Sequence, residues 1–316
     1  SRAGYRTSLV GNGLNTALNQ AGRGLTSVGA LQHLFFSPDA LRGIEGYLST
    51  FDEHGQDLID RLEKIRDFLL NPRRWTLSFT GTATVFRSLC NRLATWRGRM
   101  RIEPIRDSAY PFNAFSKPSR EGLAGPLKIA HCARVMPAPG GIHPDLPLLR
   151  LGLYIVNFDY FLPEIRFKGN AYGAGSSYNS ASGTVALTSY FDPHITETLD
   201  IFEGLKRFVQ ASAWRQIDID RAIIGSAKGA EKPIRPEQAT ALALMRYITG
   251  ETDAVRNEQY ATLLRATPGE VRRVLLDYLD HSEAPSAVCV VSSREKLEDA
   301  NRILNLDPLA ISDILS

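Results

Sequence analysis

An arginine and a tyrosine six residues apart, Arg166 and Tyr172, lie in a segment that also contains three glycines. Arginine offers a fixed fork of N–H donors and tyrosine a phenolic hydroxyl, so the pair suits binding of a carbonyl or a carboxylate. The glycines allow a backbone or a ligand to come close. The alternative interpretation is a turn at a strand edge in which the arginine is incidental and the tyrosine belongs to the core.

Other catalytic patterns are absent from the sequence. It contains neither the glycine-rich phosphate-binding loop nor the Gly-x-Ser-x-Gly motif of serine hydrolases. Asp218 and Asp220 alternate and are candidates for a cation site, but a carboxylate pair without further oxygen ligands is weak. We expect these two residues to cap a helix instead.

Composition places the 316-residue chain among ordinary globular proteins, with 43% hydrophobic and 22% charged residues and length enough for about two domains. No apolar run approaches the roughly 20 residues that span a bilayer, and no secretory signal pattern is present. Three scattered cysteines are expected to be small buried hydrophobes, which mildly favours a reducing compartment such as the cytoplasm or an organelle matrix. Localisation otherwise stays open.

The first part of the chain is predicted to be rich in helices. Apolar residues at helical spacing predict a helix over 58–69, and residues 83–96 predict another. Between them, Trp75–Gly81 alternates and is rich in β-formers, so we expect a strand. Residues 97–126 gather proline, arginine, serine and glycine without periodicity, which predicts a boundary.

The second part alternates strands and helices. Strands are expected over 127–135, 170–178, 184–190 and 287–291. Helices are expected over 144–161, after Asp192-Pro193 as N-cap and first residue, from Pro236 to Gly250, after a Thr267–Glu270 capping box, and after Ser292–Glu295. The order predicts an α+β fold with helices on one face of a mostly antiparallel sheet.

From Glu121 to about Asn301 the chain resembles the C-terminal half of the pitrilysin and insulin-degrading family of zinc peptidases, in its presequence-protease branch. The resemblance rests on Leu162–Gly175, Ser189–Pro193 and Thr198–Asp200, in that order. Residues 37–81 fit more loosely as the end of a preceding domain. The predicted division is therefore a truncated third family domain over 1–96, a linker over 97–125 and a fourth family domain over 126–316.

The resemblance implies a role for the opening pair of residues. In that family two halves close around a chamber, and the N-terminal half holds zinc through an inverted His-x-x-Glu-His motif. Tyr172 would then donate its hydroxyl to the substrate carbonyl, and Arg166 would hold the substrate backbone or its end. Gly169, Asn170, Ala171 and Gly173 would bind substrate beside them. The implied partners are the zinc-bearing N-terminal half, in the same polypeptide or another subunit, and unfolded peptides.

The histidines depart from the zinc-binding pattern, because no two of them have the inverted-motif spacing. His194 comes nearest, with Glu197 three residues on but Thr198 where the second histidine must stand. His131 lies on an apolar strand face and is expected to be a hydrogen-bonded core residue. The six are His33, His54, His131, His143, His194 and His281. We expect this chain to bind no zinc and to be inactive alone, with zinc as the cofactor of the complete enzyme.

Two alternatives remain. One is a non-catalytic scaffold or binding subunit of the same fold. The other is nucleic-acid binding through the arginines near residues 92–106, although no stacking aromatics interleave with them and a solvated linker or a contact with an acidic surface fits them better. Steep salt dependence would mark nucleic-acid binding.

Overall fold

The computed structural model describes residues 2–100, 102–104, 119–230, 233–279 and 286–315. Contacts divide the chain into two compact units. The first unit comprises Ser1–Glu45, Phe112–Ala230 and Ala254–Ser316, and the second comprises Gly46–Pro111 and Glu231–Asp253. Residues 1–45 thus cluster with the C-terminal part of the chain, whereas the predicted family division into 1–96, 97–125 and 126–316 stays a prediction.

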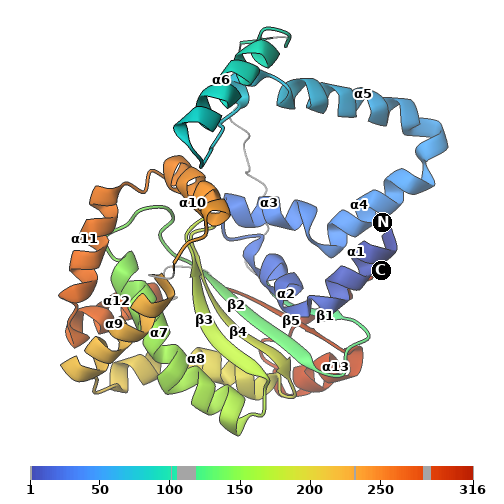
Figure 1. Ribbon diagram of the computed structural model, residues 1–316. Coiled ribbons are helices and arrows are strands. Elements are labelled where there is room, and N and C mark those ends of the chain that lie inside the picture. The colour runs from blue at the N-terminus through green and yellow to red at the C-terminus, as the bar shows by residue number, and fades with distance from the viewer. Residues whose placement is uncertain (1, 101, 105–118, 231–232, 280–285, 316) are drawn as a thin grey trace. The chain divides into compact units, whose positions relative to one another are not determined.

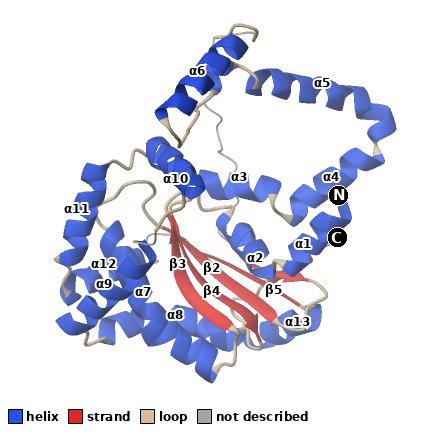
Figure 2. Ribbon diagram, viewed as in Figure 1, coloured by secondary structure: helices blue, strands red, loops and turns tan. Residues whose placement is uncertain are grey.

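The first unit is built on a six-stranded sheet in the order β3-β4-β2-β5-β1-β6 (Figures 1 and 2). Antiparallel pairs join β3 to β4, β4 to β2 and β2 to β5, and parallel pairs join β5 to β1 and β1 to β6. The strands are β1 (Arg120–Ala124), β2 (Ala130–Pro137), β3 (Gly173–Asn179), β4 (Thr184–Asp192), β5 (Ala287–Ser292) and β6 (Ala310–Asp313). The predicted α+β class with a mostly antiparallel sheet is confirmed.

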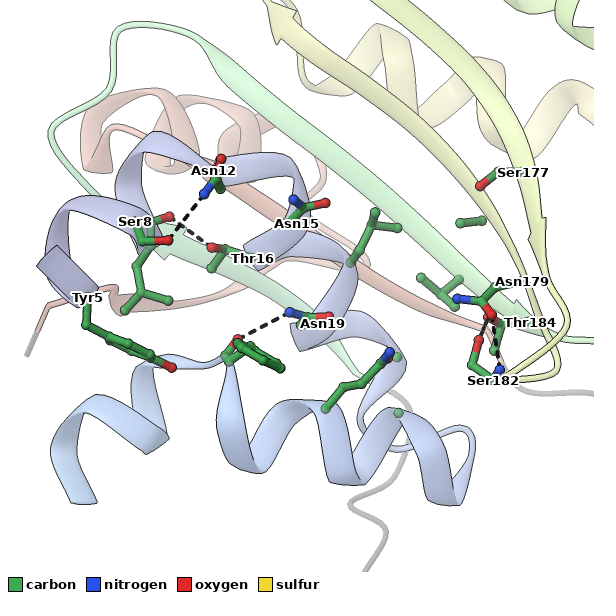
Figure 3. Close-up of a pocket in the computed structure, with 18 residues that line it drawn as sticks. Tyr5, Ser8, Asn12, Asn15, Thr16, Asn19, Ser177, Asn179, Ser182 and Thr184 are labelled. Carbon is green, nitrogen blue, oxygen red and sulfur yellow. Dashed lines mark hydrogen bonds between the residues drawn. The ribbon is translucent and has the colours of Figure 1, made fainter. Parts of the chain in front are cut away.

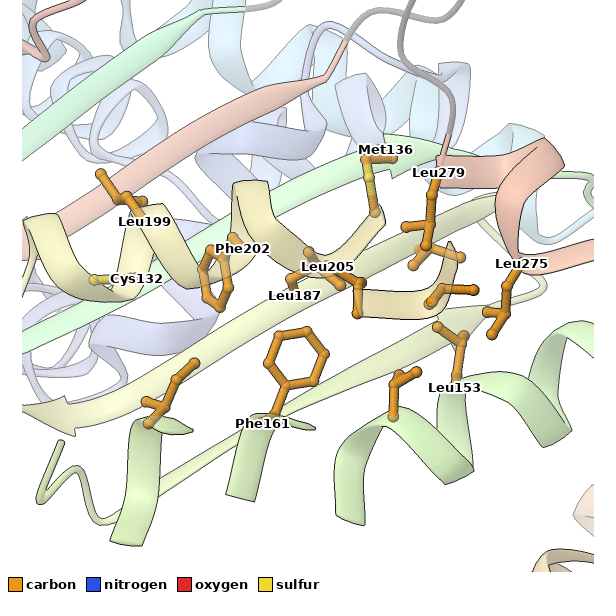
Figure 4. Close-up of a cluster of buried hydrophobic side chains, with 14 of the residues drawn as sticks. Cys132, Met136, Leu153, Phe161, Leu187, Leu199, Phe202, Leu205, Leu275 and Leu279 are labelled. Atoms are coloured by element: carbon orange, nitrogen blue, oxygen red, sulfur yellow. The ribbon is translucent and has the colours of Figure 1, made fainter. Parts of the chain in front are cut away.

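Most helices of this unit pack on one face of the sheet, as Figure 4 shows for part of the core. Phe161, Leu187 and Leu205 are each at most 1% exposed and meet at its centre. The elements on this side are α7 (Leu146–Val156), η2 (Asn157–Lys168), α8 (Thr196–Ala211), α9 (Gln216–Ala230), α12 (Pro268–Leu279) and α13 (Arg294–Ile303). α11 (Asp253–Leu264) precedes α12 along the chain.

One helix, α2 (Gly13–Gly22), covers the opposite face of the sheet. Its small residues Ala17 and Ala21 are at most 2% exposed and allow close packing over β2 and β5. Arg23 forms an ion pair with Glu121 of β1, which fastens the end of α2 to the sheet. The helices beside it are α1 (Arg2–Gly11), α3 (Ser27–Phe35) and the start of α4 (Pro38–Ser49).

The second unit consists of helices with largely exposed side chains. Its elements are α5 (Phe51–Leu69), the short 3₁₀ turn η1 (Pro72–Arg74), α6 (Ala83–Arg97) and α10 (Pro236–Thr249). The predicted helices over 58–69 and 83–96 are confirmed. Among the described residues, no helix is both long and apolar enough to cross a membrane.

The strand predicted over Trp75–Gly81 is wrong, because this stretch has no regular structure. Its alternating pattern has no neighbouring strand with which to pair in the described part of the second unit. Residues 97–125, predicted as a linker, include β1, which lies as a parallel strand between β5 and β6. Most of the remaining linker, including Arg101, falls outside the described residues.

Two local predictions around the helices need correction. The helix expected to end before Pro163 continues instead as the wide π-helix η2. Proline removes an N–H and its ring crowds the preceding turn, and a widened turn accommodates both effects. The helix expected directly after Asp192 begins at Thr196, because the Asp192 carboxylate accepts from the backbone N–H of His194 at 2.9 Å and forms a turn first.

The expected caps elsewhere are confirmed except at Asp220, which accepts from the side-chain amide of Gln216 at 2.9 Å and from no backbone N–H that the structure describes. Thr267 and Glu270 exchange side chain to backbone hydrogen bonds at the start of α12, and Gly250 ends α10 with a φ of 73°. Asp218 accepts from the backbone N–H of Arg215 at the start of α9. Of the cysteines, Cys132 and Cys289 are buried as expected, whereas Cys90 is exposed, so that prediction fails there.

Candidate functional site

The chain turns from η2 into β3 within the segment that contains Arg166 and Tyr172. The backbone N–H of Gly169 donates to the carbonyl of Glu164, five residues back, and that of Ala171 donates to the carbonyl of Ile165, six residues back. Asn170 takes the left-handed conformation, with a φ of 58°. Asparagine tolerates this conformation better than most residues, and it redirects the chain into the strand.

Gly169 closes the helix end for a steric reason. A Cβ atom at this position would lie 2.6 Å from the carbonyl oxygen of Ile165, a distance that no side chain accepts without movement of the backbone. Ala171, at 4% exposure, is buried in the core, and Asn170 is exposed. Of the residues predicted to bind substrate, Gly169 and Ala171 therefore have a clear structural role in shaping the turn.

The two predicted catalytic side chains both face solvent. Tyr172 is 66% exposed, and Arg166 is also exposed at the last turn of η2. In the part of the chain that the structure describes, neither side chain makes a hydrogen bond or an ion pair. The interpretation of Tyr172 as a core residue is therefore wrong, and both side chains are free to bind a ligand.

An aromatic cluster that sequence reasoning missed holds Tyr172 in place. The rings of Tyr190 and Phe191 meet the Tyr172 ring edge to face, with centroids 5.6 and 6.0 Å away. The backbone N–H of Tyr172 donates to the carbonyl of Phe191 at 3.2 Å. Both partners lie at the end of β4, opposite the start of β3. Only the pairing register of β3 and β4 brings these two residues next to Tyr172, and the sequence does not determine that register.

Gly173 makes room for this cluster. A Cβ atom there would lie 2.3 Å from Cε1 of Tyr190, so the ring occupies space that only glycine leaves open. Phe191 is itself strained, with a φ of 48° in the left-handed region. Bulky residues adopt this region rarely, and such outliers occur disproportionately at functional sites.

The buried His131 ring packs against this aromatic cluster. Its ring packs edge to face on Phe191 at 5.2 Å, and a Cβ atom on Gly13 of α2 would lie 2.5 Å from its Cδ2. Burial lowers the pKa of His131, and the Asp192 carboxylate raises it to a lesser extent. The histidine is 4% exposed, as expected of a core residue. However, its buried Nδ1 has no partner among the described residues, so the prediction of a hydrogen-bonded imidazole fails at that atom.

The donor atoms of the described residues do not fit a zinc ion. His194 Nδ1 lies 3.6 Å from Glu197 Oε1, in an ordinary surface pair between residues three apart. Within the described ranges, no three His, Cys, Asp or Glu side chains gather so that they could hold a metal. A catalytic zinc normally takes three protein ligands, and Thr198 instead donates to Asp192 at 2.7 Å.

Comparison with known proteins gives the family. Residues 148–292 match the model of the presequence protease C-terminal domain. The mitochondrial presequence protease of Emericella nidulans is 26% identical over 96% of this chain and 30% of its own length. That of Aspergillus fumigatus is 24% identical over 94% of this chain and 28% of its own length. A solved structure, the inactive peptidase M16 domain from Pseudomonas fluorescens, is 14% identical and covers 66% of this chain and 51% of its own, with a TM-score of 0.49.

The described residues form a six-stranded sheet with flanking helices and contain no group of side chains that could hold a metal. Residues 148–292 match the presequence-protease C-terminal domain, and over most of its length the chain is homologous to the presequence proteases of the pitrilysin-type family. It spans less than a third of the length of the two fungal relatives.

Proposed function

We propose that this chain is the C-terminal, substrate-binding half of a zinc metalloendopeptidase that degrades unfolded peptides inside a closed chamber. Family membership supports the activity, and the exposed Arg166 and Tyr172 support the binding role. The observation that carries the proposal is Tyr172, whose ring is fixed by aromatic neighbours while its hydroxyl stays free for a ligand.

Tyr172 acts as a hydrogen-bond donor in the proposed reaction. Its O–H donates to the carbonyl oxygen of the scissile peptide as negative charge develops there. Because Tyr190 and Phe191 already hold the ring, little ordering remains to be done when substrate binds. A preorganised donor of this type typically contributes ~10²–10³ in rate.

Arg166 acts in binding. Its guanidinium presents several N–H donors from the end of η2, and these suit a main-chain carbonyl or a terminal carboxylate. Gly169, Asn170, Ala171 and Gly173 shape the turn that carries both side chains, and the exposed Asn170 stands nearest to substrate. These roles rest on the resemblance and on exposure.

The partner in this proposal is a zinc-bearing N-terminal half, in the same polypeptide or in another subunit. The zinc supplies the activated water when that half is present. Because no described group in this chain fits the metal, the chain alone is expected to cleave no peptide. The second candidate is a non-catalytic scaffold of the same fold, which would have no need of a fixed and exposed Tyr172.

The experiment is Tyr172→Phe in the complete enzyme. Loss of the hydroxyl should lower kcat by ~10²–10³ while KM and the melting temperature change little, because the ring contacts remain. Tyr247→Phe is the matched control, since Tyr247 is another exposed tyrosine, at 77%, on α10. Unchanged turnover in Tyr172→Phe would refute the catalytic role and favour the scaffold.

A further inference from the structure

A cleft of about 420 Å³ lies within the first unit, on the α2 side of the sheet (Figure 3). One wall comes from α1, α2 and α3, and the other comes from the hairpin of β3 and β4. We call it the amide cleft, because its polar lining consists of carboxamides and hydroxyls. These polar residues are Tyr5, Ser8, Asn12, Asn15, Thr16, Asn19, Gln32, Ser177, Asn179, Ser182 and Thr184.

The lining of the amide cleft contains no Asp, Glu, Lys, Arg or His. Asn12, Asn15 and Asn19 recur at spacings of three and four residues, which places them along one side of a helical turn of the chain. Figure 3 shows Asn15 and Asn19 on α2 and Asn12 directly before it, with Ser177 and Asn179 on the hairpin that forms the other wall. A site of this composition suits an uncharged ligand that offers alternating donors and acceptors.

Several of these groups are free to bind. In the described part of the chain, the side chains of Asn15, Gln32 and Ser177 make no hydrogen bond. Asn179 uses its Oδ1 to accept from the backbone N–H groups of Ala181 and Ser182, at 3.0 and 3.2 Å, and keeps its two N–H donors free. The two walls therefore offer donors and acceptors to the same space.

The outer edge of β3 is closed to a pairing strand at its centre. Asn157 of η2 donates its Nδ2–H to the carbonyl of Ser176 at 3.0 Å and accepts from the Ser176 N–H. Its carboxamide thus replaces the neighbouring strand that an edge would otherwise attract. An extended ligand must lie on the face of β3 and not along its edge.

On the α2 side this face of β3 carries small side chains. Residues 173, 175, 177 and 179 alternate onto it, and they are Gly, Gly, Ser and Asn. Ser177 and Asn179 are exposed, whereas the Tyr190 ring lies over Gly173 at the start of the strand. The seven residues of β3 span about 23 Å, with Tyr172 directly before its first residue and Asn179 in the cleft as its last. A peptide of about seven residues in extended form matches this length.

We propose that the amide cleft binds the uncharged main chain of an extended peptide segment, which continues along the face of β3 towards the Tyr190 and Tyr172 rings. The choice of a peptide as the ligand rests on the proposed function. Each carboxamide can accept from an N–H and donate to a C=O of the peptide main chain. Because the lining is neutral, it does not select peptides by the charge of their side chains. The cleft would therefore hold substrate of any sequence at a distance from the cleaved bond.

The test is a binding titration on the isotope-labelled 316-residue chain, followed by the side-chain amide signals of its asparagines. The probe is an acetylated and amidated heptapeptide of alternating serine and alanine. A second probe has the same sequence with an N-methyl group on every other residue, which removes half of the main-chain donors. Maltotriose serves as an uncharged carbohydrate. We expect saturable shifts at Asn15, Asn19 and Asn179 with the first probe alone.

The variants Asn15→Ala and Asn179→Ala should each weaken binding roughly 3- to 10-fold, the range for one or two neutral hydrogen bonds. Asn91→Ala, on the exposed surface of α6 and outside the cleft, is the matched control and should leave binding unchanged. Equal binding of the N-methylated peptide, binding of maltotriose alone, or no shift with any probe would overturn the proposal. The assay needs neither zinc nor turnover, so its failure leaves the role of Tyr172 untouched, and the reverse also holds.

Discussion

Gly173→Ala should destabilise the protein through one identifiable contact. The added methyl carbon would lie 2.3 Å from Cε1 of Tyr190 and 2.5 Å from its Cζ and Oη. Overpacking of this kind costs about 1–3 kcal/mol, and replacement of glycine returns about 0.4–1 kcal/mol by restricting the unfolded chain. Because the half-buried Tyr190 ring can swing partly outward, we expect a net loss of about 1–2 kcal/mol.

A double-mutant cycle measured by urea unfolding isolates this contact. In a Tyr190→Ala background the added methyl no longer clashes with the ring, so Gly173→Ala should leave the free energy of unfolding unchanged or raise it slightly. Gly175→Ala is the matched control on the same strand face, where the nearest atom is Oδ1 of Asn157 at 3.2 Å. An equal cost of Gly173→Ala in both backgrounds would refute the assignment of the strain to Tyr190. In the complete enzyme, the displaced Tyr190 should also release Tyr172 and lower turnover.

Two further predictions concern acid stability. Burial alone would raise the pKa of Glu121, but hydrogen bonds from Arg23 and Gln20 outweigh it and hold that pKa below its ordinary value. The ionised Glu121 therefore stabilises the fold at pH values above the ordinary glutamate pKa, and this stabilisation is lost as the pH falls through the lower pKa of the folded protein. In urea unfolding, Glu121→Gln should cost about 2 kcal/mol at pH 7 and progressively less below about pH 4.5. Burial lowers the pKa of His131, so the folded protein favours the neutral imidazole. The free energy of unfolding is therefore highest at pH values above the ordinary histidine pKa, and it falls as the pH drops below that pKa. His131→Gln should flatten the fall in stability below about pH 6.5, and an unchanged slope would contradict this account.

Sequence patterns predicted the parts of the fold that depend on local chemistry. The capping box at Thr267 and Glu270 and the glycine stop at Gly250 form as expected, because each depends on residues within a few positions. The buried β5 follows from a short run of β-branched residues. The predicted order of strand, helix, two strands, several helices, strand and helix is confirmed from β2 to α13.

Features that depend on distant partners could not be predicted in this way. Trp75–Gly81 has the alternation of a strand but no partner, whereas β1, with a small and partly polar sequence, is ordered by β5 and β6 on its two sides. The packing of α2 on the sheet depends on small residues whose contacts lie more than a hundred positions away. The continuation of η2 through Pro163 required a change of helix type that no local pattern announces.

In the candidate site, too, the features that depend on local residues could be predicted and those that depend on distant partners could not. Arg166 and Tyr172 could be singled out from residue type and spacing, but their aromatic support could not, because Tyr190 and Phe191 meet Tyr172 only through the β3–β4 register. His131 was placed correctly in the core, yet its link to the site through Phe191 required the structure. The amide cleft joins helices near the N-terminus to a hairpin about 160 residues later, and no motif marks it.

The turn between η2 and β3 explains how two exposed side chains can still be precisely placed. Ile165 and Ala171 are 1% and 4% exposed, and each is the direct neighbour of one of the two candidate residues. A hydrogen bond from Ala171 to the carbonyl of Ile165 ties these buried anchors together. Arg166 and Tyr172 therefore leave the core from fixed points, and Tyr190 and Phe191 also hold the Tyr172 ring. Exposure on a rigid base is what the proposed function requires, because a zinc-bearing half and a substrate would supply the missing contacts while the backbone is already ordered.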